Sequence, residues 1–270
     1  MNSSLGRSAL VFASILGTSS AFAEVRYSSI PDKLPGNVAS VGFEATSTSE
    51  FGDHVRFIDK GKNDIKKVTV VVSSWGCEAG GWNTGDCVTK PGAKFSMPIT
   101  LNIYAVDNTG AQPAVGALLA TRTQTFKIAY RPSSDAACTG GRWYDKHDKV
   151  CYRGFADEIE FDLGSLHLKD LPDEVIWGVA YNTSHHGYAP VGEATACYTS
   201  SGGCGYDSLN IGADTIPNLI GTDVDPTSAF INTTPGFYCD GGPGGTFRGD
   251  YGCTPANDWS LNRPMVEFKK

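Results

Sequence analysis

Four closely spaced pairs of cysteines constrain the fold of this 270-residue chain more than any other feature of its sequence. The separations within the pairs are 10, 13, 7 and 14 residues, and the pairs are Cys77 and Cys87, Cys138 and Cys151, Cys197 and Cys204, and Cys239 and Cys253. Eight cysteines can pair in about 105 ways, and the clustering favours bridges between nearest neighbours. Each bridge would then close one local loop and make it rigid, and such loops are common places for binding and catalysis.

Structural zinc sites are the competing interpretation of paired cysteines. Such sites place two to four residues between the ligands of a pair. The closest pair here, Cys197 and Cys204, is separated by 7 positions. The spacing therefore favours disulfides, and we predict neither a metal nor a cofactor.

The N-terminus has the pattern of a secretory signal peptide. Arg7 is the only charge in the first 23 residues, an apolar stretch runs from Ala9 to Leu16, and small residues end in Ala21-Phe22-Ala23. We predict cleavage before Glu24, with a retained N-terminal anchor as the alternative. The apolar stretch is short for a membrane span, so we expect a soluble, secreted protein, extracellular or periplasmic, where disulfides persist.

The charge balance disfavours partners that need a basic surface. The formal net charge is −7, and loss of Arg7 with the signal peptide makes it −8. An acidic surface disfavours nucleic acid and anionic membranes as partners. We expect a monomer with no membrane span.

Short, β-branched apolar segments bounded by Gly, Pro, Asn and Asp predict about ten strands and no amphipathic helix. Residues 158–163 alternate, so Ile159, Phe161 and Leu163 should face the core, while residues 175–181 are apolar on both faces and predict a central strand. The other expected strands cover residues 38–45, 54–58, 68–74, 99–106, 118–128, 207–211, 229–232 and 264–269.

This pattern predicts an all-β fold, an antiparallel, jelly-roll-like β-sandwich with long disulfide-pinned loops. Residues 24–270 should form one domain, in which the last strand, Met265 to Lys269, lies near the first. Each of the long segments 131–157, 182–206 and 233–263 contains one cysteine pair. Irregular segments this long are uncommon unless they are functional or disordered.

The cysteine-bearing loops hold four of the five tryptophans in or beside them. Rigid exposed aromatics next to Asp, Asn and Gly suit sugar faces or protein partners. The same rings could instead pack on the disulfides as small cores, and the sequence leaves both interpretations open. The candidate ligand-binding residues are Trp82, Trp143, Tyr144, His185, His186 and Tyr188.

The adjacent histidines His185 and His186 offer groups that bind metals or act as a general base. Glu193 and Asp207 are possible acidic partners in the sequence. A solvated or hydrogen-bonded loop pair is the alternative.

Two acidic patterns are weaker signals. Glu158, Glu160 and Asp162 share one strand face, where paired carboxylates can hydrolyse glycosides, but an ordinary solvent face has the same pattern. Asp223-Val224-Asp225 could contact calcium, but it lacks the loop of a calcium-binding EF-hand. The chain has no Gly-x-Ser-x-Gly elbow, His-Glu-x-x-His motif or phosphate-binding glycine loop, and four bridges would leave no thiol nucleophile, so we predict no catalytic residue.

Several stretches spread over most of the mature chain carry a resemblance: GDHVRF (52–57), VVVSSWGC (70–77), PITLNIY (98–104), TQTFKIAYRP (123–132) and YDSLN (206–210). Together they resemble a group of secreted bacterial β-sandwich proteins of no established activity. Residues 101–123 are also similar to jelly-roll modules of bacterial surface proteins, although residues 111–116 replace a tighter Pro-Gly turn and leave the hairpin register open. The resemblance implies a sandwich fold and an extracellular location, and it implies no catalytic residues.

The leading hypothesis is a secreted, non-enzymatic binding module that recognises a glycan or a cell-surface partner through its aromatic-bearing disulfide loops. An extracellular hydrolase that uses the loop of His185 and His186 is the first alternative. The second is a purely structural component of the envelope or matrix.

Overall fold

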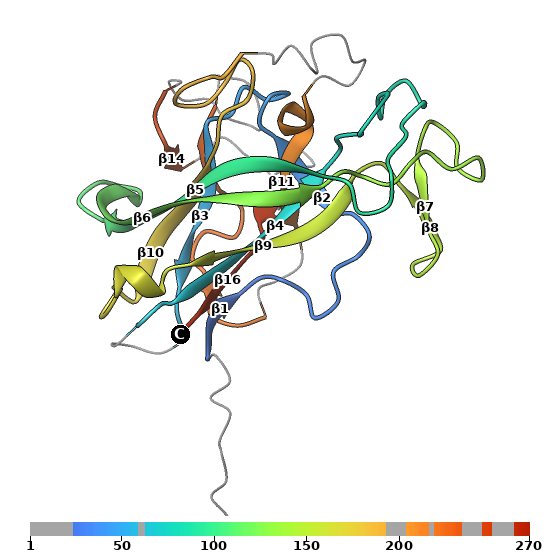
Figure 1. Ribbon diagram of the computed structural model, residues 1–270. Helices are drawn as coiled ribbons and strands as arrows, with labels where there is room; N and C mark the ends of the chain where they lie inside the picture. The colour runs from blue at the N-terminus through green and yellow to red at the C-terminus, as the bar shows by residue number, and fades with distance from the viewer. Residues whose placement is uncertain (1–23, 59–62, 193–203, 216–218, 234–244, 250–261) are drawn as a thin grey trace, which may run out of the picture.

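Two antiparallel β-sheets packed face to face form the body of the protein (Figure 1), as the sequence predicted. The structure is a computed structural model that describes residues 24–58, 63–192, 204–215, 219–233, 245–249 and 262–270. The predicted signal peptide, residues 1–23, lies outside the described residues, as do Cys197, Cys239, Cys253 and Glu193. Among the described residues, no helix is long and apolar enough to cross a membrane.

The first sheet is built around β4 (Lys67–Ser74), whose apolar run is buried along almost its whole length. Its path runs β1 (Val25–Ser28), β16 (Val266–Lys269), β4, β11 (Leu209–Asp214) and β15 (Arg263–Pro264), while β9 (Phe155–Asp162) pairs with β4 and β2 (Ala39–Gly42) pairs with β11. The last strand, β16, pairs with β1, a strand that was not predicted from the sequence, whereas the first predicted strand, at residues 38–45, corresponds to β2 and pairs with β11.

The second sheet contains the two longest strands of the described residues, β5 and β6. Its path runs β14 (Arg248–Gly249), β13 (Phe230–Asn232), β3 (Glu50–Arg56), β10 (Glu174–Ala180), β5 (Lys94–Asp107) and β6 (Ala114–Ala129), and β12 (Thr222–Asp223) pairs with β3. The predicted central position of β10 is confirmed, since it pairs with β3 on one side and β5 on the other.

Strand β3 begins four residues earlier than the sequence predicted. Its first four residues are Glu50, Phe51, Gly52 and Asp53, and three of these are poor strand formers. Pairing with β10 along all seven residues of β3 overrides that local preference. The predicted strand at 207–211 also shifts, because Gly205–Ser208 form a 3-10 turn, η2, and β11 starts at Leu209. A second such turn, η1, covers Gly164–Leu166.

The core lies between the sheets and follows the predicted alternation. Ile159 and Phe161 of β9 are buried, whereas Glu158 and Glu160 on the opposite face are exposed. Trp177 of β10 is completely buried and belongs to the same apolar cluster as Val68, Val70 and Val72 of β4. Each fully buried aliphatic or aromatic side chain of this kind contributes about 1.5–3 kcal/mol.

Gln124 of β6 connects the open edges of the two sheets. Its Nε2 donates to the carbonyl of Glu160 at 3.2 Å, and its Oε1 accepts from the backbone N–H of Asp162 at 3.3 Å. Both of these partners lie on β9. The amide thereby satisfies edge groups that would otherwise be open to pairing with another chain.

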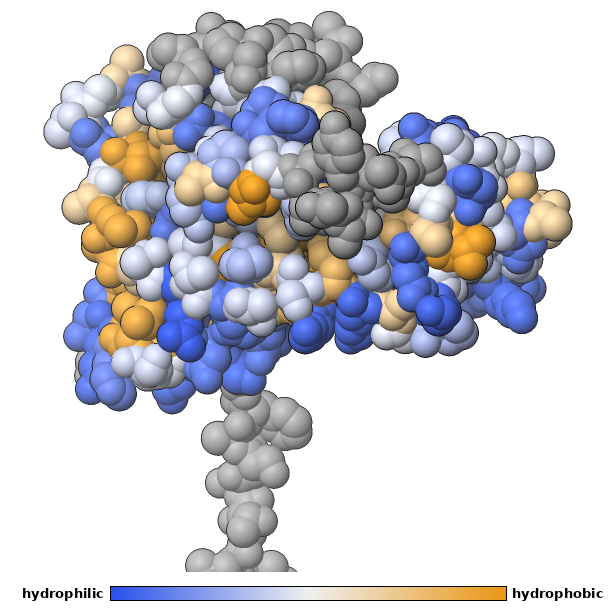
Figure 2. All heavy atoms as spheres, turned by 45° about the horizontal axis from the view of Figure 1, so that its top comes forward, coloured by the Kyte–Doolittle hydropathy of each residue, from blue (hydrophilic) through white to orange (hydrophobic). Residues whose placement is uncertain are grey.

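Two loops closed by disulfides project from the sandwich body. Cys77 pairs with Cys87, and Cys138 pairs with Cys151, so two of the predicted nearest-neighbour bridges are confirmed. Cys204 is also disulfide-bonded, and its predicted partner lies outside the described residues. We call residues 75–92 and 133–153 the disulfide lobe, which contains the short hairpin of β7 (Trp143–Asp145) and β8 (Val150–Tyr152) and stands apart from the sandwich body at the right of Figure 2.

Arg131, at the end of β6, holds the two halves of the disulfide lobe together. Its backbone N–H donates to the carbonyl of Gly76 at 2.9 Å, and its Nη2 donates to the carbonyl of Gly141 at 2.8 Å. The side chain is completely buried, and among the described residues its Nη1 has no hydrogen-bond partner. Burial, followed by the nearby Arg153, lowers the pKa of Arg131 to about 10, so the guanidinium stays charged at neutral pH.

We predict that Arg131→Lys destabilises the protein by about 1–3 kcal/mol. The ammonium group cannot reproduce the planar fork of the guanidinium, so the bond to the Gly141 carbonyl is lost or bent while a buried charge remains. Urea denaturation measures the change. Arg56→Lys, at an exposed ion pair with Glu174, is the matched control and should change stability by less than about 1 kcal/mol. Equal stability of the Arg131→Lys variant and the wild type would contradict the role assigned to this residue.

Candidate functional site

An open cavity of about 740 Å³ lies where the disulfide lobe meets the ends of β5 and β6. Its walls come from residues 89–93, residues 129–130, residues 132–136, the pair Trp143 and Tyr144, and Phe155. We call this cavity the lobe groove. Small-ligand pockets in proteins usually have volumes of roughly 300–1,000 Å³, and the lobe groove falls within this range.

The two halves of the disulfide lobe are joined beside the groove by backbone contacts. Ser134 N donates to the carbonyl of Cys87 at 2.9 Å, and Thr89 N donates to the hydroxyl of Ser133 at 2.9 Å. A Cβ on Gly141 would lie 2.5 Å from the Cα of Gly85, so the two loops approach too closely there for any side chain. Trp143 and Tyr144 lie inside the loop closed by Cys138 and Cys151, and the other wall residues flank the two closed loops, where these contacts hold them in place.

Aromatic rings form much of the apolar lining of the groove. Tyr130 packs against Phe95 with ring centroids 5.0 Å apart, and both Tyr130 and Tyr144 keep part of their surface exposed. Trp143 is only 7% exposed, and its Nε1 donates to the carbonyl of Gly154 at 2.7 Å. Of the two predicted residues, Tyr144 therefore offers accessible surface, whereas Trp143 mainly supports the wall.

Trp82, another predicted binding residue, does not line the lobe groove. Its ring meets Trp75 edge to face at 4.7 Å, and the guanidinium of Arg153 lies 5.8 Å from its centroid. This arrangement matches the alternative in which the loop aromatics pack as a small core. Trp82 and Arg153 come from different halves of the lobe, so their contact adds to its rigidity.

The histidine pair lies elsewhere in the structure. His185 Nδ1 forms a hydrogen bond with the carboxylate of Glu44, a residue 141 positions away. Asp207, suggested by the sequence as a partner, instead accepts bonds from the N–H and hydroxyl of Ser184, each at 2.8 Å. The sequence could not reveal Glu44, since only the fold brings the turn after β2 to this loop.

Tyr188 is also separate from the lobe groove. It is 66% exposed and lines a different cavity, on the outer face of the second sheet. The six predicted ligand-binding residues therefore divide between the disulfide lobe and the loop that follows β10.

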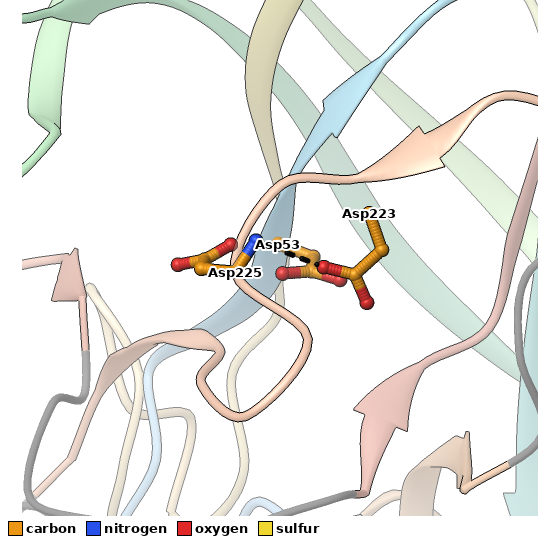
Figure 3. Close-up of side chains that lie close together, drawn as sticks. All are labelled: Asp53, Asp223 and Asp225. Atoms are coloured by element: carbon orange, nitrogen blue, oxygen red, sulfur yellow. Dashed lines mark hydrogen bonds between the residues drawn. The ribbon is translucent and has the colours of Figure 1, made fainter.

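The carboxylates of three aspartates lie close together beneath the surface and form a second candidate site (Figure 3). Asp53 comes from β3, Asp223 from β12 and Asp225 from the turn that follows, and their ligand oxygens lie within 4.8 Å of one another. Pairing of β12 with β3 creates the cluster by placing Asp223 opposite Val55. Arg263, near the C-terminus, forms an ion pair with Asp223. The sequence pointed to Asp223 and Asp225 and missed Asp53 and Arg263, which are distant along the chain.

Burial governs the protonation of this cluster. Burial raises the pKa of Asp225 to about 7, with a further contribution from Asp223, and it also raises the pKa of Asp53 and of Asp223. Among the described residues, neither carboxylate oxygen of Asp225 has a hydrogen-bond partner. Three carboxylates with one arginine can lower their repulsion by holding a proton, and their oxygens are also of the type that hard cations take.

We predict that the free energy of unfolding falls as the pH rises from about 4 to 7 because of this cluster. Between the unfolded pKa of about 3.9 and the raised folded value, the native state binds more protons than the unfolded state, so stability decreases with pH. Asp225→Asn should flatten this slope and raise the melting temperature at pH 8 by roughly 2–4 °C or more, the shift expected per 1 kcal/mol in a chain of this size.

Thermal melts from pH 4 to pH 8 in chelator-containing buffer measure the effect. Asp32→Asn removes an equal charge from an exposed position and is the control for net charge. A slope that is identical in the wild type and in Asp225→Asn would show that the cluster does not titrate as described.

Comparisons of the chain with protein-family models, with curated proteins and with solved structures found no match. The resemblance to secreted bacterial β-sandwich proteins therefore stays a prediction. What the protein does must be inferred from the geometry and chemistry of its own surfaces, which include the lobe groove of about 740 Å³.

Proposed function

We propose that this protein is a secreted, non-enzymatic binding module that recognises a neutral glycan through the lobe groove. The observation that carries the proposal is the position of this aromatic-lined cavity between two loops that are each closed by a disulfide. Tyrosines suit the faces of sugar rings because one ring combines an apolar face with a polar tip.

The polar part of the lining supports a sugar rather than an apolar ligand. Thr89, Ser133 and Ser134 belong to the lining. Their hydroxyls already form hydrogen bonds within the lobe, and each keeps a lone pair that can accept from a sugar hydroxyl. One cation, Lys90, and one anion, Asp135, belong to the same lining, so the groove has no excess of either charge. A neutral ligand fits this balance and fits the acidic character of the whole chain.

The rigidity of the groove supports binding by a preformed site. A loop that is ordered before binding loses less entropy when the ligand arrives. The disulfides order each loop, and Arg131 connects both loops to the end of β6. An open groove of about 740 Å³ suits one or two units of an extended chain.

The compartment agrees with a role at the cell surface. Two intramolecular disulfides indicate an oxidising environment, extracellular or periplasmic. Export through the predicted signal peptide at residues 1–23 would deliver the chain there, where glycans of envelopes and matrices are its available ligands.

An extracellular hydrolase is the second candidate, supported by the bond between His185 and Glu44. A carboxylate that orients a histidine is one part of a catalytic triad. The neighbouring hydroxyl of Ser184, however, donates to Asp207 and not to a histidine. We therefore favour binding over hydrolysis.

We predict that Tyr144→Ala lowers the affinity for a bound neutral glycan at least tenfold, because the side chain supplies accessible aromatic surface to the groove. An array of neutral plant, fungal and bacterial glycans identifies the ligand, and calorimetry with the best hit measures the dissociation constant. Val150→Ala is the matched control, since Val150 lies exposed on the partner strand of the same hairpin and does not line the groove.

Three outcomes would count against the proposal. They are an array without a hit, an affinity that is unchanged by Tyr144→Ala, and an equal loss in Val150→Ala. Turnover of a hit glycan that disappears in His185→Ala would instead support the hydrolase.

A further inference from the structure

One row of residues crosses five strands of the second sheet and lines a separate cavity of about 390 Å³ on its outer face. Glu50 of β3 lies opposite Asn232 of β13 on one side and Ala180 of β10 on the other. Ala180 in turn faces Thr100 of β5, which faces Thr123 of β6. Because residues in register on neighbouring strands share a face, this row presents its polar side chains together.

Glu50 is a buried carboxylate whose position is tightly held. It is only 9% exposed, and its Oε1 accepts hydrogen bonds from Asn102 Nδ2 and from the hydroxyl of Tyr104, each at 2.9 Å. Asn102 is itself held, since its Oδ1 accepts from the Thr121 hydroxyl at 2.8 Å. Burial of a carboxylate costs free energy, and two neutral donors offset only part of that cost.

Two small residues of β10, Gly178 and Ala180, lie beside the Glu50 side chain. A Cβ on Gly178 would lie 2.8 Å from Glu50 Oε1 and 2.8 Å from Cζ of Phe247, so any side chain there would displace one of them. Ala180, next on the same face of β10, adds only a methyl group. Glu50 Oε1 and Phe247 therefore fill the space over Gly178, and the cavity opens on the other side of the carboxylate, where Glu50 and Ala180 both line it.

The lining defines the chemistry that this cavity can accept. Its other side chains include hydroxyls and amides, and Glu50 is the only charged residue among those described there. Tyr188 contributes an exposed aromatic ring at the margin. An anionic ligand would be repelled by the carboxylate, and an apolar ligand would leave the polar row without partners.

We propose that this cavity is a second ligand site, which takes one neutral sugar residue whose hydroxyls donate to Glu50 and whose ring lies against Tyr188. The sugar hydroxyls would meet further donors and acceptors from Thr100, Asn102 and Thr123. The site shares no residue with the lobe groove, so failure of one proposal would not imply failure of the other.

Ligand-observed saturation-transfer NMR tests this site with glucose, galactose, mannose, N-acetylglucosamine and glucosamine as probes. The wild type should bind at least one neutral sugar, with the transferred signal lost or reduced at least fivefold in both Glu50→Gln and Tyr188→Ala. Tyr188→Ala alters an exposed side chain and therefore tests the site even if Glu50→Gln perturbs folding. Thr125→Val, two residues beyond Thr123 on the same face of β6, should keep the signal.

Absence of binding to every neutral sugar would overturn the proposal, as would full binding by both cavity variants. Binding of glucosamine alone would also overturn it, since the carboxylate would then be selecting an ammonium group. A signal lost only in Tyr144→Ala would assign the sugar to the lobe groove and would likewise overturn this second site.

Discussion

The buried guanidinium of Arg131 is the contact on which the lobe groove depends. Through its backbone the residue joins the first disulfide-closed loop, and through its side chain it joins the second. Each disulfide constrains only its own loop, so neither bridge can fix how the two loops lie relative to one another. Direct hydrogen bonds between the loops supply part of that relation, and Arg131 supplies the part that connects both loops to the end of β6, and hence to the sandwich itself. Burial of a cation costs free energy, which is consistent with a function that depends on the relative position of the two loops.

The two candidate ligand sites and the aspartate cluster lie in three different parts of the fold. The lobe groove lies on loops outside the sandwich, the Glu50 cavity lies on the outer face of the second sheet, and the aspartate cluster lies at the inner side of β3. Successive residues of β3 point to opposite faces, which is why Glu50 and Asp53 come to different surroundings from one short strand. Burial raises the pKa of both carboxyl groups, and Glu50 adjoins an open cavity whereas Asp53 is only 1% exposed.

Much of the fold could be predicted from local patterns. Alternation in residues 158–163 and the apolar run of residues 175–181 report burial directly, and cysteine spacing was enough to pair two disulfides that the structure describes. Strand β3 could not be delimited, because its early residues form a strand only through pairing with β10. The hairpin of β7 and β8 was missed for a similar reason, since three-residue strands have too few positions to show a period.

The candidate sites were predicted less well, because they depend on contacts between distant residues. Tyr144 could be proposed from its place in a cysteine-closed loop, yet the same reasoning selected Trp82, which packs against Trp75 instead. The exposure of an aromatic ring depends on neighbours that are distant along the chain, so a short sequence window cannot predict it. Glu50 had no signal at all, since neither its burial nor its partners Asn102 and Tyr104 can be inferred before the strands are paired.

The most direct test of the central claim is a crystal structure of the protein soaked with the best neutral glycan from the array. Density for a sugar ring is predicted in the lobe groove, in contact with Tyr130 or Tyr144 and within hydrogen-bond distance of a hydroxyl from Thr89, Ser133 or Ser134. A glycan that binds in solution but lies outside the groove in the crystal, with the groove left open, would contradict the claim.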